Sequence, residues 1–260
     1  MKFSANLGFL YTDLPLTEAV YAAKADGFDA LECHFPYDTP PADLKAALEA
    51  TSLRMLGMNT RPGDRAAGDF GLAALVGREA EARIEIDRAF DYAAAAGIEA
   101  VHVMAGRTDG GAAAENCFRA NLNYACDLAA ECKITVLIEP INTRDVANYH
   151  LSGTGHAVRI IDDLARPELK IMFDCYHMQI MQGDLAHSVE ELLPKIGHIQ
   201  IAAVPDRGEP DRGEVNYAWL LRHITNLGYD GYIGAEYRPR AGTRDGLRWM
   251  ANIAKATACL

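Results

Sequence analysis

The sequence predicts a single (β/α)8 barrel, the TIM-barrel fold, spanning residues 1–260. Three observations lead to this prediction. Short apolar runs alternate with longer segments of helical period, glycines stand where a helix passes into the next strand, and no linker or low-complexity tract interrupts the pattern. With 260 residues and a hydrophobic content of 50%, the chain can bury one core of barrel size.

Eight apolar runs are expected to form the strands of the barrel. They cover residues 3–7, 30–35, 54–59, 100–105, 135–140, 170–174, 198–202 and 232–236. The helices are expected between them, at residues 16–25, 43–50, 78–96, 114–131, 155–164, 189–193, 217–226 and 244–255. Gly27, Gly97 and Gly228 each lie between a helix and the next strand, where a left-handed residue ends a helix tightly.

Strict alternation of strand and helix implies parallel strands covered by helices, and eight such units favour closure into a barrel. An open doubly wound sheet is the alternative, but neither a GxGxxG motif nor a Walker loop follows the first strand. One long irregular segment, TRPGDRAAGDFGLAALVG at residues 60–77, follows the third strand. We expect this segment to form a lid or a substrate-binding loop, because barrel active sites lie at that end of the strands.

Charge and composition exclude several kinds of partner. A net charge of −11 opposes binding to nucleic acid, which depends on lysine and arginine neutralising phosphates. The six cysteines include no CxxC pair and are interpreted as reduced thiols. The N-terminal MKFSANLGFL has no signal-peptide pattern, and no stretch approaches the roughly 18 apolar residues of a membrane span. We therefore expect a cytoplasmic protein with neither a nucleic-acid nor a membrane partner.

Oxygen-bearing side chains stand at the ends of four consecutive predicted strands. They are Glu139, Asp174, Gln200 and Glu236. Their separations are about one strand–helix unit each, so a barrel places them at similar height around one part of its mouth. Taken singly, a strand-end carboxylate more often pairs with an arginine or caps a helix. Four such side chains at matching strand ends favour a site for a hard divalent cation, Mg²⁺ or Mn²⁺, because the ligands are carboxylate and amide oxygens.

Other polar residues are candidates for binding the substrate. His177 follows Asp174 closely and, as a neutral imidazole, could polarise a substrate oxygen, or it could simply pack in a loop. Arg207, in the loop after the seventh strand, could hold a substrate carboxylate or pair with a neighbouring acid. Arg65 and Arg212 are the next candidates for that role.

Weaker candidates lie at the ends of the second and third strands, where Glu32, Tyr37 and Asn59 could line the opposite wall. The remaining histidines are interpreted as structural, since they fall within apolar runs or have no partner at ligand spacing. They are His102, His150, His156, His187, His198 and His223. His34, near the end of the second strand, is left undecided.

Several longer motifs resemble the hydroxypyruvate isomerase family. They are LIEPIN at residues 137–142, FDCYHMQ at 173–179, GHIQIA at 197–202, PDRGEPDRGEVNY at 205–217 and GAEYRPR at 234–240. The resemblance implies a xylose-isomerase-like barrel in which Glu139 and Glu236 transfer protons. It also implies that Glu139, Asp174, Gln200 and Glu236 form the metal site. Related ketose 3-epimerases commonly carry histidine at the position of Gln200, so the likeness is to the isomerase branch.

The implied substrate is a small hydroxy-carbonyl acid. Hydroxypyruvate and tartronate semialdehyde interconvert when a proton moves between two adjacent carbons. The nearest alternative is a 2-oxo-tetronate isomerase, which acts on a four-carbon 2-oxo acid, and a ketose 3-epimerase is a more distant one. A nuclease would require a histidine-rich zinc cluster and a basic face, and the sequence predicts neither. Assembly into a homo-oligomer is left open.

Overall fold

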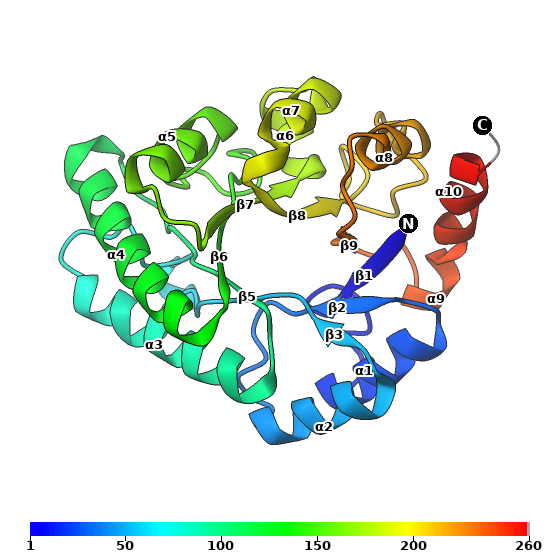
Figure 1. Ribbon diagram of the computed structural model, residues 1–260, viewed down its shortest axis with the longest axis horizontal. Coiled ribbons are helices and arrows are strands. Elements are labelled where there is room, and N and C mark those ends of the chain that lie inside the picture. Colours follow the sequence, from blue (N-terminus) through cyan, green and yellow to red (C-terminus); the bar gives the residue numbers. More distant parts are fainter. Residues whose placement is uncertain (259–260) are drawn as a thin grey trace.

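A ring of parallel strands surrounded by helices forms the molecule, which is described here by a computed structural model for residues 1–258 (Figure 1). The strands pair in the order β3-β2-β1-β9-β8-β7-β6-β5-β4, and every pair is parallel. The strands are β1 Lys2–Asn6, β2 Ala30–Glu32, β3 Arg54–Met55, β4 Met58–Asn59, β5 Ala100–His102, β6 Thr135–Ile138, β7 Leu169–Asp174, β8 Ile196–Ile201 and β9 Tyr232–Ala235. The predicted barrel fold is confirmed.

The third predicted strand explains why the sheet has nine strands in place of eight. Residues 54–59 are interrupted at Leu56 and Gly57, so that β3 pairs with β2 whereas β4 pairs with β5. Across the interruption, the Leu56 N–H donates to Leu31 O and the Gly57 carbonyl accepts from Cys33 N–H. One segment therefore contacts both of its neighbours and closes the ring.

The helices follow the predicted alternation, with small differences at their ends. They are α1 Leu16–Ala25, α2 Pro41–Thr51, α3 Glu79–Ala96, α4 Gly111–Cys132, α5 Thr154–Leu164, α6 Cys175–Met181, α7 Leu185–Leu192, α8 Tyr217–Asn226, α9 Thr243–Gly246 and α10 Arg248–Ala258, with 3-10 turns η1 Arg65–Ala67 and η2 Leu193–Lys195. The predicted helix 244–255 is divided into α9 and α10. Helix α6 replaces an expected strand end or loop, because the Asp174 side chain accepts a hydrogen bond from Tyr176 N–H and starts a helix directly after β7.

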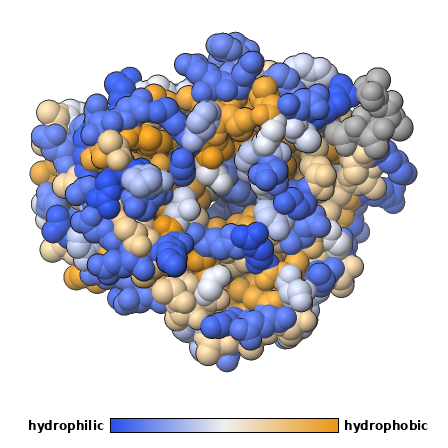
Figure 2. Space-filling model, viewed as in Figure 1, coloured by the Kyte–Doolittle hydropathy of each residue, from blue (hydrophilic) through white to orange (hydrophobic). Residues whose placement is uncertain are grey.

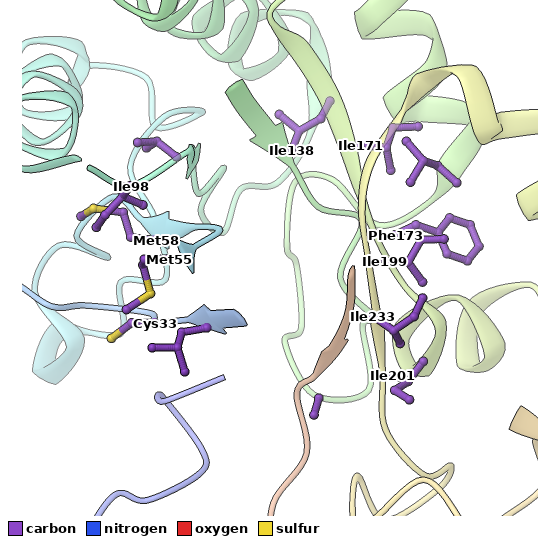
Figure 3. Packing of buried hydrophobic residues seen from close by; sticks show 14 of the residues in the cluster. Cys33, Met55, Met58, Ile98, Ile138, Ile171, Phe173, Ile199, Ile201 and Ile233 are labelled. Atoms are coloured by element: carbon purple, nitrogen blue, oxygen red, sulfur yellow. The ribbon is translucent and has the colours of Figure 1, made fainter. Parts of the chain in front are cut away.

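The main hydrophobic core lies between the strands and the surrounding helices. It joins strand residues such as Ile171 and Phe173 to helix residues such as Ile160 and Leu185. Figure 3 shows Ile171, Phe173, Ile199, Ile201 and Ile233 grouped along neighbouring strands. Inside the ring, the apolar cluster is small and consists of Ala100, Leu137 and Met172. The rest of the interior contains buried polar side chains, including Ser4, Glu32, His102, His198 and Gln200.

The segment 60–77 packs onto the end of β5. The amides of Ala73 and Ala74 donate to Met104 O and Ala105 O at 3.2 and 2.7 Å. Gly71 has a φ of +110°, and a Cβ there would lie 2.6 Å from Met104 O, so only glycine allows this close approach. The segment is thereby held against the mouth of the barrel.

Hydrophilic residues cover much of the outer surface in the view of Figure 2, as expected for helices whose apolar sides face the sheet. Within residues 1–258, none of the helices combines the length and apolar character needed to span a bilayer. Cys33, Cys117, Cys126, Cys132 and Cys175 are free thiols, whereas Cys259 lies outside the described residues.

Trp249 of α10 offers a test of how the last helix closes the barrel. Its ring is fully buried, packs edge-on against Phe3 of β1 at 4.9 Å, and donates from Nε1 to Tyr237 Oη at 3.1 Å. Trp249→Ala should therefore lower the free energy of unfolding by about 3–5 kcal/mol, measured by urea denaturation. Trp219, which is 48% exposed, is the control, and Trp219→Ala should cost less than about 1 kcal/mol. Equal losses in the two variants would contradict this assignment.

Candidate active site

A cavity of about 800 Å³ opens at the carboxyl ends of the strands. Side chains from the strand ends line it, among them the predicted residues Asn59, Glu139, His177, Arg207 and Glu236. The segment 60–77 contributes Pro62, Arg65 and Phe70 to the wall. The segment thus lines the cavity, and its expected role as a lid or substrate-binding loop stays a prediction.

Three carboxylates and one imidazole converge in this cavity. Glu139 follows β6, Asp174 ends β7, Glu236 follows β9, and His177 lies in α6. All four residues are buried, and one ligand atom from each lies within 4.8 Å of the others. Three of the four predicted metal ligands are thus brought together, because parallel strands in register end at similar height.

Gln200, the fourth predicted ligand, pairs in register with Asp174 but also contacts a second polar group inside the barrel. Its Nε2 donates to Glu32 Oε2 at 2.7 Å. Its Oε1 is buried and has no hydrogen-bond partner among residues 1–258. Glu32 thus holds the amide nitrogen, while the amide oxygen is left without a partner among these residues.

The two glutamates of the cavity have opposite electrostatic surroundings. Glu236 accepts hydrogen bonds from Asn6 Nδ2, His34 Nε2 and Arg207 Nη2 at 3.1, 2.8 and 2.6 Å. Burial opposes its ionisation, but the Arg207 guanidinium and then His34 outweigh burial and lower the pKa of Glu236. Burial, reinforced by the charges of Glu236 and Asp174, raises the pKa of Glu139. Glu139 Oε1 has no hydrogen-bond partner in the described part of the chain.

His177 presents a hydrogen-bond donor to this group of carboxylates. Its Nδ1 faces the backbone N–H of Asn142 at 3.3 Å and the Asn142 side-chain amide at 2.6 Å. Because these groups donate, Nδ1 accepts and the proton of the neutral ring lies on Nε2. That Nε2 lies 3.6 Å from Glu139 Oε1 and 3.5 Å from Asp174 Oδ2. Burial followed by the Arg207 charge lowers the pKa of His177, so the ring is a neutral donor.

Arg207 provides the cationic side chain closest to the carboxylates. Its Nη2 lies 2.6 Å from Glu236 Oε2 and 3.5 Å from Asp174 Oδ2. The guanidinium stacks between the rings of Phe9 and Tyr176, each about 5.0 Å from its Cζ. Of the two reserve candidates, Arg65 lines the same cavity, whereas Arg212 lies in a separate hollow with Glu209 and Asp211.

Comparison with known proteins identifies the family of this chain. Residues 20–253 match the family described as "Xylose isomerase-like TIM barrel". The chain belongs to this family. A Cupriavidus necator protein named 2-oxo-tetronate isomerase is 47% identical over 96% of this chain and 97% of its own length. An Escherichia coli protein named hydroxypyruvate isomerase is 40% identical over 96% of this chain and 98% of its own. A crystal structure titled as an AP endonuclease, family 2, from Brucella melitensis superposes with a TM-score of 0.93 at 40% identity, covering 96% of this chain and 98% of the other.

Two histidines that sequence analysis did not assign to the site line the cavity of this protein. His34, left undecided, contacts Glu236 Oε1 from the end of β2. His102, interpreted as structural, lies 3.6 Å from Glu139 Oε2, and neither ring nitrogen has a hydrogen-bond partner among residues 1–258. Burial lowers the pKa of His102 to about 3 and keeps it neutral. The sequence feature that could have indicated this position is the alternation of side chains along a strand, which places His102 on the same inner face as Ala100.

His150 and His156, interpreted as structural because no ligand stands near them in the sequence, have a partner that is distant along the chain. Both contact Glu115, which lies 35 and 41 residues away in the sequence. Tyr37, a weak candidate for the cavity wall, instead donates its hydroxyl to the backbone oxygen of Asn59 and lies in an outer hollow with Arg61. Only the tertiary packing of these segments reveals the contacts.

Glu32 organises a second buried polar group below the cavity. Its Oε1 accepts from Ser4 Oγ at 2.5 Å and lies 3.0 Å from His198 Nε2, while Oε2 accepts from Gln200. Burial disfavours a charged His198, but the Glu32 carboxylate outweighs burial and raises the pKa of His198. Gly234 of β9 leaves the space for this group, since a Cβ there would lie 2.4 Å from Glu32 Oε1.

Gly234→Ala tests the packing of this interior group. The added methyl group would also lie 2.8 Å from Gln200 Cγ and from His198 Nε2, so the polar side chains must shift. We expect the free energy of unfolding to fall by about 1–3 kcal/mol, the usual cost of overpacking. Gly57→Ala is the control, because the nearest atom to its Cβ is Ala100 O at 3.8 Å. A Gly234→Ala protein as stable as Gly57→Ala would show that the interior can rearrange freely.

Proposed function

We propose that this chain is an isomerase that interconverts hydroxypyruvate and tartronate semialdehyde by moving a proton between adjacent carbons. The observation that carries the proposal is the pair Glu139 and Glu236 in one buried cavity, with pKa values displaced in opposite directions. Two carboxyl groups whose environments differ in this way are suited to act as acid and base. The E. coli relative named hydroxypyruvate isomerase supports this substrate.

In the proposed mechanism, one of the two glutamates removes a proton from a substrate carbon and the other completes the transfer. His177 would donate from Nε2 to the substrate oxygen on which negative charge develops. Arg207 would hold the substrate carboxylate with its planar guanidinium, and Asn59 would contact the substrate from the wall of the cavity. The segment 60–77 would exclude water from the reactive intermediate.

We further propose that four oxygen-bearing side chains of this part of the barrel bind a divalent cation, Mg²⁺ or Mn²⁺. Glu139, Asp174, Gln200 and Glu236 would hold it. The unpartnered buried oxygens Glu139 Oε1 and Gln200 Oε1 support this assignment, because hard cations prefer such carboxylate and amide oxygens. When bound, the cation would supply positive charge next to the reacting oxygens of the substrate.

A four-carbon substrate is the second candidate. The relative named 2-oxo-tetronate isomerase is 47% identical to this chain, against 40% for the E. coli relative. A cavity of about 800 Å³ has room for the additional carbon. Measurement of kcat/KM for hydroxypyruvate and for 2-oxo-tetronate decides between them, with aldehyde formation followed by NMR for the first. Turnover of neither acid would refute the proposal.

The net charge of −11 is also more compatible with a small acidic metabolite as substrate than with DNA, because DNA binding depends on many lysine and arginine contacts with phosphates. A cytoplasmic location and a single domain over residues 1–260 stay predictions, and homo-oligomer formation is still open.

Glu139→Gln and Glu236→Gln test the proton transfer. Each should lower kcat by about 100-fold or more even at saturating Mn²⁺, because general acid–base groups typically contribute that much. Glu190→Gln on the exposed side of α7 is the control and should leave kcat unchanged. If the two glutamates only hold the cation, activity should return at high Mn²⁺. Turnover like that of the unmodified protein in either variant would remove that residue from the mechanism.

Arg207→Ala tests recognition of the substrate carboxylate. Losing a charge-assisted bond should cost about 2–4 kcal/mol, which corresponds to a KM raised about 30-fold or more. Arg207→Lys should recover only part of this loss, because lysine keeps the charge but not the planar fork. Arg238→Ala, in the wall of the same cavity, is the matched control. An unchanged KM in Arg207→Ala would transfer the role to Arg65.

A further inference from the structure

A second group of metal-ligating side chains lies outside the catalytic cavity. Glu115 is in the first turns of α4, His150 is in the loop after β6, and His156 is in the first turn of α5. One ligand atom from each of the three residues lies within 4.8 Å of the others. We propose that these residues bind a transition-metal cation of the zinc class at a site separate from the catalytic one.

The three side chains converge on a single carboxylate oxygen. Glu115 Oε2 lies 2.7 Å from His156 Nε2 and 3.1 Å from His150 Nε2. Arg119 Nε donates to the other oxygen, Oε1, at 2.6 Å and so fixes the orientation of the carboxylate. Tetrahedral zinc ligands are about 3.3 Å apart, given zinc–nitrogen and zinc–oxygen distances of about 2.0–2.1 Å. The Glu115 oxygen would therefore have to move a few tenths of an ångström away from each imidazole to admit the ion, and the two imidazole nitrogens lie within 4.8 Å of each other.

The His150 ring is held in a position suitable for a ligand. Its side chain is only 3% exposed, and its ring packs edge-on against Phe118 with centroids 5.5 Å apart. Without a metal, Nε2 donates to the Glu115 carboxylate, and Thr108 Oγ1 lies 2.9 Å from Nδ1. A bound cation would require the ring proton to move to Nδ1, where Thr108 Oγ1 can accept it.

The ligand set distinguishes this site from the catalytic one. Two imidazole nitrogens and one carboxylate oxygen favour Zn²⁺, Ni²⁺ or Co²⁺ over Mg²⁺, which prefers oxygen ligands. The side chains of Glu115 and His156 are each 24% exposed, so water can reach the ion and complete its coordination.

A cation at this site would connect α4, α5 and the loop that follows β6. The same loop carries Ile141, Asp145 and Val146, which line the catalytic cavity. Next to His150, Tyr149 Oη accepts from Ala105 N–H, and its ring packs against Phe70 of the segment 60–77 at 5.9 Å. We therefore infer a structural role, in which the cation holds this wall of the cavity in place.

Calorimetric titration of the full chain with Zn²⁺, in millimolar Mg²⁺ to occupy the catalytic site, tests the inference. One equivalent of Zn²⁺ should bind and raise Tm. Glu115→Gln and His156→Ala should each lose this equivalent and the rise in Tm, because each removes one of three ligands. His187→Ala on α7, outside the group, should keep both.

Two outcomes would overturn the inference. If the unmodified chain binds no Zn²⁺, the three side chains form a hydrogen-bonded contact only. If Glu115→Gln and His156→Ala both bind Zn²⁺ as the unmodified chain does, the ion occupies another group such as the exposed Cys132. Neither result bears on the proposed isomerase activity, since no turnover is measured.

Discussion

The rest of the structure depends on one constraint, which is that the carboxylates buried inside the barrel need cationic or hydrogen-bonding partners. Glu32, Glu139, Asp174 and Glu236 are each at most 5% exposed. Burying a carboxylate costs several kcal/mol unless cations and hydrogen bonds compensate it. Arg207 compensates Glu236, and His198 with Ser4 and Gln200 compensates Glu32. Glu139 Oε1 accepts no hydrogen bond from the described residues, and burial raises the pKa of this carboxyl although the Arg207 charge opposes the shift.

The barrel can tolerate this polar interior because its apolar packing lies elsewhere. Along each parallel strand, alternate side chains face the helices or the inside of the ring. On the outer face, residues such as Phe173 and Ile199 join the main core, whereas the inner apolar group contains only Ala100, Leu137 and Met172. One face of the sheet therefore supplies stability, and the other is available for chemistry.

The wall of the cavity depends on contacts between loops that lie far apart in the sequence. The segment 60–77 is held on the end of β5 by backbone hydrogen bonds and by the close approach at Gly71. The loop after β6 packs against it through Tyr149 and Phe70. His150 belongs to this loop and contacts Glu115 of α4, so the second cluster and the cavity share one structural element.

The barrel and the carboxylates that meet in its cavity could be predicted from the sequence, because both follow from local periodicity and from the position of a residue at a strand end. Glu139, Asp174 and Glu236 meet because parallel strands in register end together. What only the tertiary structure decided depends on side-chain contacts over long separations: His34 with Glu236, Gln200 with Glu32, and Glu115 with its two histidines. Sequence spacing cannot determine such contacts, because the directions of individual side chains are set only when helices and loops pack on the sheet.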